Sequence, residues 1–301
     1  MINLITKTQK EYSLVDSGDG EKLERFGDFL IIRPETQALW QKKNPDVWQK
    51  ANAIFTKDGW KLSKGTPENF EFEIHGIKAL INFGKGRNLG VFPEYSGEWN
   101  VLEKVLKTKT NPTALPVAGL RPRVLNLFAY TGLSSIVCAK AGASVVHVDS
   151  SRTSNETAKK LSDENGVGDK IRFITEDSLS FMKKEGRREN KYDLIILDPP
   201  TFGRGNKGQV FKIEEKLAEL ILEAKKLLSE NPMGIILSGY SSEFTSLSYS
   251  NVLAGCTGME TVHGTLSIEE EGERLSLPLA KWAFAFNSQE IGGIISELIN
   301  N

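Results

Sequence analysis

The chain has 301 residues, of which 39% are hydrophobic and 26% charged, and its formal net charge is −1 at pH 7. That length and composition are typical of a soluble globular protein with two domains, and they exclude a low-complexity chain. The charge excludes a molecule that is basic throughout, so a nucleic-acid partner has to be bound by a local basic patch.

The first residues, MINLITKTQKEY, lack the basic region, apolar run and cleavage site of a signal peptide. No later apolar run approaches the roughly 18 residues of a membrane span. The two cysteines, Cys138 and Cys256, show neither CxxC pairing nor histidines at metal-ligand spacing. We therefore expect a cytoplasmic protein with no membrane contact, no metal site and no disulfide framework.

Short β-type runs fill the first hundred residues. FGDFLIIRP, NAIFTKDGWKLS and FEFEIHGIKALINFGKG are separated by Gly, Pro, Asp and Asn turn residues, a pattern typical of antiparallel strands. The next segment, VLEKVLKTKTNPTALPVAGLRPR, predicts a helix followed by a connector that its prolines keep irregular. We place the domain boundary in that connector, which gives a small β-rich domain at 1–110 and a second domain at 111–301.

The stretch GKGRNLGVFPEYSGEW, residues 84–99, combines glycines with Arg87, Phe92 and Glu94. This mixture is richer in charged and aromatic side chains than a plain linker needs, and loops of that kind often carry function. We expect the three residues to border the functional site. The alternative is a β-hairpin with an aromatic core.

From residue 123 onward the pattern changes to strands that alternate with helices. RVLNLF, SVVHVD, IRFITED, YDLIILD and GIILSGYS are short, rich in Val and Ile, and far enough apart for a helix each, which indicates right-handed βαβ units. IEEKLAELILEAKKLLSE predicts an amphipathic helix, and METVHGTLSIEEEGERLSLPLAKWAFAFN predicts two long strands. The fold class is therefore α/β, a doubly wound Rossmann-like sheet with a C-terminal antiparallel hairpin.

Small or acidic residues follow four successive strands, at the edge where an open parallel sheet binds its ligand. The turn FAYTG follows the first strand, Asp149 the second, Asp177 the third and the DPP stretch the fourth. A carboxylate after the second strand suits a ribose diol, and Asp177 with Ser178 suits an adenine. The alternatives are tight packing for the turn and helix caps for the two acids.

NLFAYTG, HVDSS, TEDS and LDPPTFGRG give residues 123–287 a resemblance to class I S-adenosylmethionine-dependent methyltransferases. More narrowly, the chain resembles the branch that contains the 5-methylcytosine and 7-methylguanine methyltransferases of large-subunit ribosomal RNA and bacterial relatives of undefined substrate. A small β-rich domain precedes the catalytic one in that branch. The cofactor has no pyrophosphate, so FAYTG does not need the three glycines that a nicotinamide-dependent oxidoreductase requires.

The resemblance implies where S-adenosyl-L-methionine binds: the methionine part on NLFAYTG, the ribose on Asp149 and the adenine on Asp177, with residues 84–99 folded over the cofactor. Asp198 lies beside the methyl donor and the incoming base. The predicted cofactor-binding residues are Arg87, Phe92, Glu94, Asn126, Phe128, Ala129, Tyr130, Thr131, Gly132, Asp149, Ser150, Ser151, Asn165, Asp177, Ser178 and Asp198. The predicted catalytic residues are Asp198, Pro199, Pro200 and Phe202.

The DPPTFGRG stretch also has a physical interpretation. Two prolines stiffen the strand exit and remove donors, so a carbonyl is left to accept from a ligand amine, while Phe202 offers a stacking surface for a base. The alternative is a rigid strand exit followed by a solvated loop. The basic residues that we expect to contact RNA phosphates are Arg204, Lys207 and Lys212.

Methylation of carbon 5 of cytosine needs a cysteine nucleophile, which this branch places after the fifth strand or in the DPP-type loop. Here the fifth strand ends in LSGYSS, and the loop has no cysteine. Cys138 falls on the apolar face of the first helix and Cys256 is remote in sequence. The sequence therefore predicts direct displacement by a nitrogen or oxygen lone pair, for which the enzyme supplies mainly orientation.

The leading hypothesis is an S-adenosylmethionine-dependent methyltransferase that acts on RNA, ribosomal by resemblance. One alternative is a methyltransferase for a small molecule or protein, which the near-neutral charge favours. Another is a cofactor-binding protein without catalysis, against which the intact acids and DPP argue. A serine hydrolase is excluded because no G-x-S-x-G elbow follows a strand.

Overall fold

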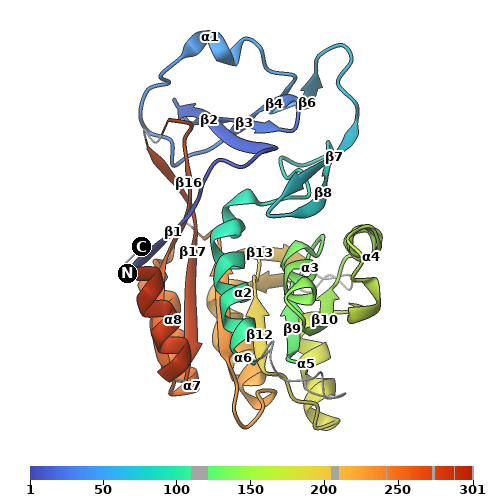
Figure 1. Ribbon diagram of the computed structural model, residues 1–301, viewed down its shortest axis with the longest axis vertical. Helices are drawn as coiled ribbons and strands as arrows, with labels where there is room; N and C mark the ends of the chain where they lie inside the picture. Colours follow the sequence, from blue (N-terminus) through green and yellow to red (C-terminus); the bar gives the residue numbers. More distant parts are fainter. Residues whose placement is uncertain (110–120, 205–209, 242, 273–274, 288, 300–301) are drawn as a thin grey trace. The chain divides into compact units, whose positions relative to one another are not determined.

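Two compact units make up the chain. The computed structural model describes residues 1–109, 121–204, 210–241, 243–272, 275–287 and 289–299. The large unit holds Met1–Asn3, Trp99–Thr265 and Ala280–Asn301, and the small unit holds Leu4–Glu98 and Leu266–Leu279 (Figure 1). Each unit therefore combines segments that are distant in the sequence. The boundary predicted between residues 110 and 111 lies outside the described residues.

The small unit is built mainly from antiparallel strands. β2 (Tyr12–Gly18), β3 (Glu21–Phe26), β4 (Phe29–Pro34), β5 (Ala53–Thr56) and β6 (Gly59–Leu62) form one sheet in that order, and β7 (Asn69–Ile74) pairs with β8 (Ile77–Asn82). Between β7 and β8, His75 and Gly76 have φ angles of 54° and 65°, the backbone of a tight two-residue hairpin. The unit also contains the short helices α1 (Pro45–Trp48) and η1 (Pro93–Tyr95).

Residues 84–99 do not form the β-hairpin that was the alternative for this stretch. Pro93–Tyr95 form η1, and helix α2 (Ser96–Lys109) begins directly afterwards. Pro93 fits this start because its fixed φ suits the first position of a helical turn. Glu94, Tyr95, Glu98 and Trp99 are therefore held in helical turns, and Phe92 precedes them.

A parallel sheet forms the centre of the large unit, as the sequence predicts. Its strands lie in the order β15 (Gly234–Gly239), β12 (Leu194–Leu197), β9 (Arg123–Leu127), β10 (Ser144–Asp149) and β11 (Ile171–Thr175), all of them parallel. The strand order reverses between β9 and β12, because β9 has β10 on one side and β12 on the other. Open parallel sheets bind ligands at this switch point, beyond the carboxyl ends of the strands.

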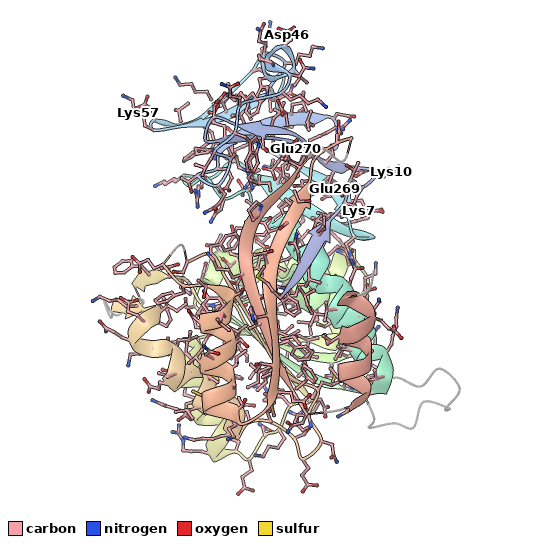
Figure 2. All side chains as sticks on the ribbon, turned by 90° about the vertical axis from the view of Figure 1, so that its left-hand side faces the viewer. Lys7, Lys10, Asp46, Lys57, Glu269 and Glu270 are labelled. Atoms are coloured by element: carbon pink, nitrogen blue, oxygen red, sulfur yellow. The ribbon has the colours of Figure 1, made fainter. Side chains whose placement is uncertain are left out.

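Helices cover both faces of the sheet. Side chains of α5 (Ser178–Arg187), α6 (Ile213–Lys226) and α7 (Ser246–Thr257) share one buried cluster with the strands. Helix α2 and helix α8 (Gln289–Ile299) lie on the opposite face (Figures 1 and 2). The remaining helices of the unit are α3 (Leu133–Lys140), α4 (Arg152–Glu164) and the short η2 (Gly168–Lys170). This is the doubly wound arrangement expected from alternating strands and helices.

The predicted C-terminal hairpin extends the sheet beyond β15. β17 (Ser276–Phe286) pairs antiparallel with β15, and β16 (Glu260–Glu269) lies next to it. The outermost strand, β1 (Ile2–Thr6), comes from the start of the chain and was not predicted. The tip of the hairpin, where Figure 2 labels Glu269 and Glu270, belongs to the small unit. There, Glu270 and Glu271 accept hydrogen bonds from Ser17 and Ser13. Over the described ranges, no helix has the length and apolar character needed to cross a membrane.

Candidate active site

The register of the sheet brings the predicted site residues to one edge. Leu127 pairs with Val148 of β10 and with Leu197 of β12, and Leu197 pairs with Leu237 of β15. The residues that follow these positions therefore leave the sheet at the same level. Phe128, Asp149 and Asp198 are such residues, and each is half-buried at the carboxyl edge.

The turn FAYTG has a strained backbone. Phe128 and Tyr130 have φ angles of 57° and 49°, and Gly132 has a φ of 85°. Positive φ is rare for residues other than glycine, and it clusters at functional sites where the surrounding structure enforces it. Ala129 lies between the two strained residues, and Thr131 is buried. The strained backbone therefore marks this turn as a candidate functional element of the large unit.

Packing explains the glycine in the turn. A Cβ atom on Gly132 would lie 2.8 Å from the Cβ of Ala158 on α4 and 3.2 Å from Cε1 of His147. Together with the φ of 85°, this contact leaves room only for glycine. Gly132 therefore lets α4 approach the turn, which is the tight-packing alternative for this residue.

Asp149 is the hydrogen-bond acceptor that holds the turn. Its Oδ2 accepts from the backbone N–H of Tyr130 at 2.8 Å, and its Oδ1 accepts from the N–H of Ser151 at 2.8 Å. Burial, assisted by the Asp149 carboxylate, raises the pKa of Tyr130. Helix α4 is capped by Ser151, whose hydroxyl accepts from Ser154 N, so Asp149 is not the cap of that helix. The exposed Ser150 lies between the two.

Asp177 and Ser178 open helix α5 at the same edge. Asp177 is exposed and caps the helix, since its Oδ1 accepts from Ser180 N at 2.9 Å, and Ser178 is 3% exposed. The helix-cap alternative is therefore realised for one oxygen of Asp177. Asn165 is not brought together with these residues. It caps the other end of α4, where its side chain donates to Leu161 O, a helix length of roughly 20 Å away.

The DPP stretch leaves β12 at Asp198. Pro199 is buried, Pro200 is exposed, and Phe202 begins β13 (Phe202–Arg204), which pairs with β14 (Val210–Lys212). Phe202 is 57% exposed, a high value for so large an apolar side chain. Opposite Phe202, Lys212 donates to Glu215 at 2.9 Å, and this bond raises the pKa of Lys212. Lys207 lies outside the described residues.

A buried polar chain behind the turn was not predicted. Asn126, which is 3% exposed, donates to Ser135 Oγ at 2.9 Å, and Ser135 Oγ lies 3.0 Å from Nδ1 of the fully buried His147. Burial lowers the pKa of His147 to about 4, so its imidazole is neutral at pH 7. Asn126 therefore supports the turn from inside the unit. In the sequence, the signal for these linked polar side chains is their position in strands and a helix where the pattern predicts buried apolar residues.

Asn155 on α4 is a second residue that sequence reasoning missed. Its Nδ2 lies 2.9 Å from Asp149 O, 3.1 Å from Ser151 O and 3.2 Å from Thr175 Oγ1. These bonds tie the ends of β10 and β11 to the first turn of α4. An asparagine one turn after the helix cap is the sequence signal for this clamp.

Arg87, Phe92 and Glu94 belong to the small unit, and they differ in their surroundings there. Arg87 is exposed, whereas Glu94 is 2% exposed and its charge contributes to raising the pKa of the buried Arg33. The ring of Phe92 lies 6.2 Å from that of Tyr95. Glu94 therefore interacts electrostatically with Arg33 of its own unit. The contact of Arg87, Phe92 and Glu94 with the cofactor stays a prediction.

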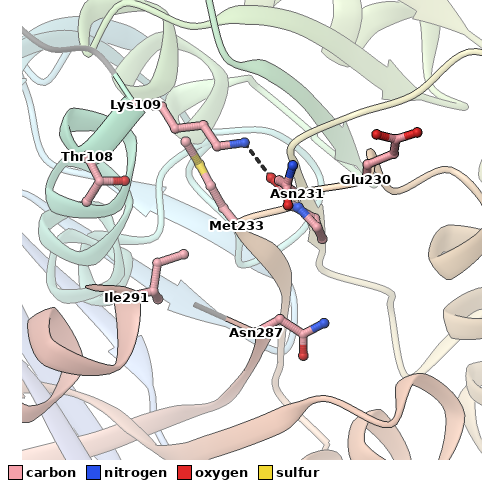
Figure 3. Close-up of a pocket in the computed structure, with 8 residues that line it drawn as sticks. Thr108, Lys109, Glu230, Asn231, Met233, Asn287 and Ile291 are labelled. Atoms are coloured by element: carbon pink, nitrogen blue, oxygen red, sulfur yellow. Dashed lines mark hydrogen bonds between the residues drawn. The ribbon is translucent and has the colours of Figure 1, made fainter. Parts of the chain in front are cut away.

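A cavity of about 410 Å³ lies at the other edge of the large-unit sheet. It is lined by Met233, which precedes β15, by Asn287, which follows β17, and by Lys109 at the end of α2 (Figure 3). Lys109 donates to Asn231 O at 2.5 Å and to Asp193 Oδ1 at 2.9 Å. The described residues that line this cavity include none of the predicted site residues.

The family described as S-adenosylmethionine-dependent methyltransferase matches residues 59–240, more than half of the chain. The chain belongs to this methyltransferase family. The chain is similar to a SAM-dependent methyltransferase from Agrobacterium tumefaciens, with 34% identity and a TM-score of 0.88 over 96% of this chain and 94% of that one.

Two curated relatives of the chain are named as ribosomal RNA methyltransferases. It is 26% identical over 244 residues to Ribosomal RNA large subunit methyltransferase I of Enterobacter sp. (strain 638), which is 74% of this chain and 58% of that protein. It is 29% identical over 215 residues to Ribosomal RNA large subunit methyltransferase K/L of Pseudomonas syringae pv. syringae, 70% of this chain and 26% of that protein. The chain therefore spans little more than half of the first relative and about a quarter of the second.

The residues at the carboxyl edge of the sheet fit S-adenosylmethionine, the cofactor of the family. Each oxygen of the half-buried Asp149 accepts one backbone N–H, and a carboxylate oxygen has a second lone pair with which it can accept from a ribose hydroxyl. The turn FAYTG contains a single glycine, which suits a ligand without a pyrophosphate group.

Proposed function

We propose that this methyltransferase transfers the methyl group to a nitrogen or oxygen atom of a base in RNA, with ribosomal RNA as the substrate. The observation that carries the proposal is the exit of β12, where the half-buried Asp198 is followed by two prolines and the 57% exposed Phe202. An exposed ring that follows a carboxylate closely in the sequence offers a base a stacking surface and an acceptor for its amino group. The names of the two curated relatives support the same substrate class.

The residues of the carboxyl edge would hold the cofactor, which supplies an electrophilic methyl group on its sulfonium. Asp149 would accept from the ribose hydroxyls, Asp177 and Ser178 would contact the adenine, and the FAYTG turn would border the methionine part. The hydrogen bonds from Tyr130 N and Ser151 N fix the Asp149 carboxylate before the ligand arrives. Such preorganisation lowers the entropy loss on binding.

The positions of both cysteines support direct displacement. Cys138 is fully buried on α3, and Cys256 lies in the last turn of α7, with its Sγ 4.0 Å from Ala218 O on α6. Helix α7 starts at the carboxyl edge, so ten residues of helix, roughly 15 Å, separate Cys256 from that edge. The main task of the chain is then to orient the accepting atom, for which Asp198 and Phe202 are placed.

A local basic patch contributes less to RNA binding in this proposal than the sequence predicts. Lys212 is paired with Glu215 at 2.9 Å, so RNA would have to compete with this carboxylate for the ammonium group. Stacking on Phe202 is therefore the stronger of the two contributions. A cytoplasmic location, which the sequence predicts, fits a ribosomal substrate.

Mass spectrometry of nucleosides tests the substrate directly. Ribosomal RNA from a strain that lacks the gene should lack one methylated nucleoside, and expression of the chain should restore it, whereas the Asp198→Ala variant should not. Methylation of that RNA by the purified protein identifies the chain as the catalyst. An unchanged set of rRNA nucleosides, together with methyl transfer to a small molecule or protein, would establish the alternative function.

Phe202→Ala separates the substrate surface from the cofactor surface. Loss of a stacking ring should raise the KM for RNA or lower kcat by about tenfold, because base stacking contributes about 1–3 kcal/mol. Affinity for S-adenosylhomocysteine, measured by calorimetry without RNA, should stay at the wild-type value. A weaker cofactor affinity with unchanged RNA kinetics would instead place Phe202 beside the cofactor.

A further inference from the structure

Tyr249 carries a buried hydroxyl group for which folding alone gives no reason. The residue is 1% exposed on α7, and its Oη has no hydrogen-bond partner among the described residues. Buried polar groups in native proteins are almost always hydrogen bonded, and an unpaired one destabilises the fold. A phenylalanine would fill the same space in the apolar cluster of α6, α7 and the sheet without that loss.

The hydroxyl lies at the carboxyl edge of the sheet, beside the DPP exit. A Cβ atom on Gly239 would come within 2.7 Å of Tyr249 Oη, so the hydroxyl rests directly against the last residue of β15. β15 is the neighbour of β12, and the pairing of Leu197 with Leu237 brings Gly239 to the level at which Asp198 leaves the sheet. The absence of a side chain at Gly239 is what lets the tyrosine reach this edge.

The Asp198 carboxylate acts electrostatically on the Tyr249 hydroxyl. Burial, reinforced by the Asp198 carboxylate, raises the pKa of Tyr249 to about 12, so the O–H group keeps its proton at neutral pH. A phenol that keeps its proton is a hydrogen-bond donor, and the Asp198 carboxylate, whose charge acts on it, is an acceptor. Hydrogen bonds of active sites are often longer before the ligand binds and shorten in the complex.

We propose that Tyr249 is a positioning residue, whose hydroxyl donates a hydrogen bond to the Asp198 carboxylate in the ligand-bound enzyme and so fixes the direction of that carboxylate. The inference rests on the proposed function, which places Asp198 beside the transferred methyl group. Asp198 then meets the accepting atom in one orientation. Tyr249 itself stays behind the site, out of contact with RNA and cofactor.

Tyr249→Phe tests the inference by binding alone. The probes are S-adenosylhomocysteine and sinefungin, an analogue that carries an amine at the position of the transferred methyl group and so reports on the Asp198 carboxylate. Calorimetry should show that Tyr249→Phe binds sinefungin about fivefold more weakly, the effect of one hydrogen bond, with unchanged affinity for S-adenosylhomocysteine. Gly239→Ala, which pushes the hydroxyl away without removing it, should have the same effect.

Asp198→Asn separates the two ways in which the inference can fail. If Asp198→Asn weakens sinefungin binding and Tyr249→Phe does not, Tyr249 has no positioning role. If Asp198→Asn also leaves sinefungin binding unchanged, the placement of Asp198 at the methyl group is wrong, and the inference fails with it. A loss of S-adenosylhomocysteine affinity in Tyr249→Phe would assign the tyrosine to the cofactor site and would also overturn it.

Tyr192→Phe is the matched control for folding. Tyr192 is equally buried in the large unit, but its hydroxyl donates to Glu185 Oε2 at 2.6 Å. Removal of this partnered hydroxyl should lower Tm and leave the sinefungin affinity unchanged. Tyr249→Phe should show the reverse, an equal or higher Tm with weaker sinefungin binding, because its unpaired hydroxyl destabilises the fold.

Discussion

Asp149 binds backbone donors with both of its carboxylate oxygens, so its role in the turn and its role toward the cofactor can be separated. Asp149→Asn keeps one acceptor for the backbone but loses the charge that strengthens hydrogen bonds to ribose hydroxyls. We expect about thirtyfold weaker binding of S-adenosylhomocysteine by calorimetry, equivalent to about 2 kcal/mol. An unchanged affinity with a lower Tm would restrict Asp149 to holding Tyr130 and Ser151.

The buried His147 predicts a pH dependence of stability. Its pKa in the folded chain is about 4, against 6.5 for an unperturbed histidine, because burial disfavours the charged imidazole. Between these values the unfolded state binds the proton and the folded state does not, so the free energy of unfolding falls as the pH is lowered from 6.5 towards 4. The loss approaches roughly 3 kcal/mol at pH 4.

His147→Asn removes this titration and keeps a side-chain amide near Ser135. Chemical denaturation of both proteins between pH 7 and pH 4.5 should show a shallower decline of the free energy of unfolding in the variant than in the wild type. Equal declines would mean that His147 takes up its proton in the folded chain as readily as in the unfolded one.

At the scale of elements, the contact between the FAYTG turn and α4 predicts the cost of a methyl group. Gly132→Ala combines a left-handed backbone with an overlap against Ala158, whereas Gly166→Ala meets a similar φ, of 69°, with nothing within 4 Å. We expect Gly166→Ala to lose about 1–2 kcal/mol of unfolding free energy and Gly132→Ala to lose about 1–3 kcal/mol more, by urea denaturation. Similar losses in both variants would exclude the helix contact as the reason for Gly132.

The parallel strands of the central sheet and their order along the chain could be predicted because each is a short apolar run with a polar residue at its carboxyl end. The pattern of β12, Leu194–Leu197 followed by Asp198, is an example. The buried hydrogen bonds that link Asn126 through Ser135 to His147 could not be predicted, because the three residues come from a strand, a helix and the next strand. Local patterns do not report contacts between elements.

At the scale of the whole molecule, strands from the first and the last parts of the chain lie in the same sheet. β1 flanks β16, and Trp282 of β17 donates to Ile2 O at 3.3 Å. A strand of five residues at the start of the chain, INLIT, carries no local signal that it joins a sheet more than 250 residues away. For the same reason, the sequence pattern assigns helix α2 to the end of the first domain, although most of the helix belongs to the large unit.

This arrangement predicts that the second domain delimited from the sequence, residues 111–301, cannot fold alone. That chain lacks α2, whose side chains Trp99, Val101, Leu102, Val105 and Leu106 are at most 2% exposed, and it lacks β1, so one edge of β16 loses its partner. Each buried apolar side chain contributes about 1.5–3 kcal/mol, and an open strand edge promotes aggregation. Residues 111–301 should therefore show no cooperative thermal unfolding and no binding of S-adenosylhomocysteine.

Residues 96–301, which regain α2 but not β1, should unfold cooperatively at a lower Tm than the full chain. Cooperative unfolding of 111–301 at the Tm of the full chain would show that neither element is needed.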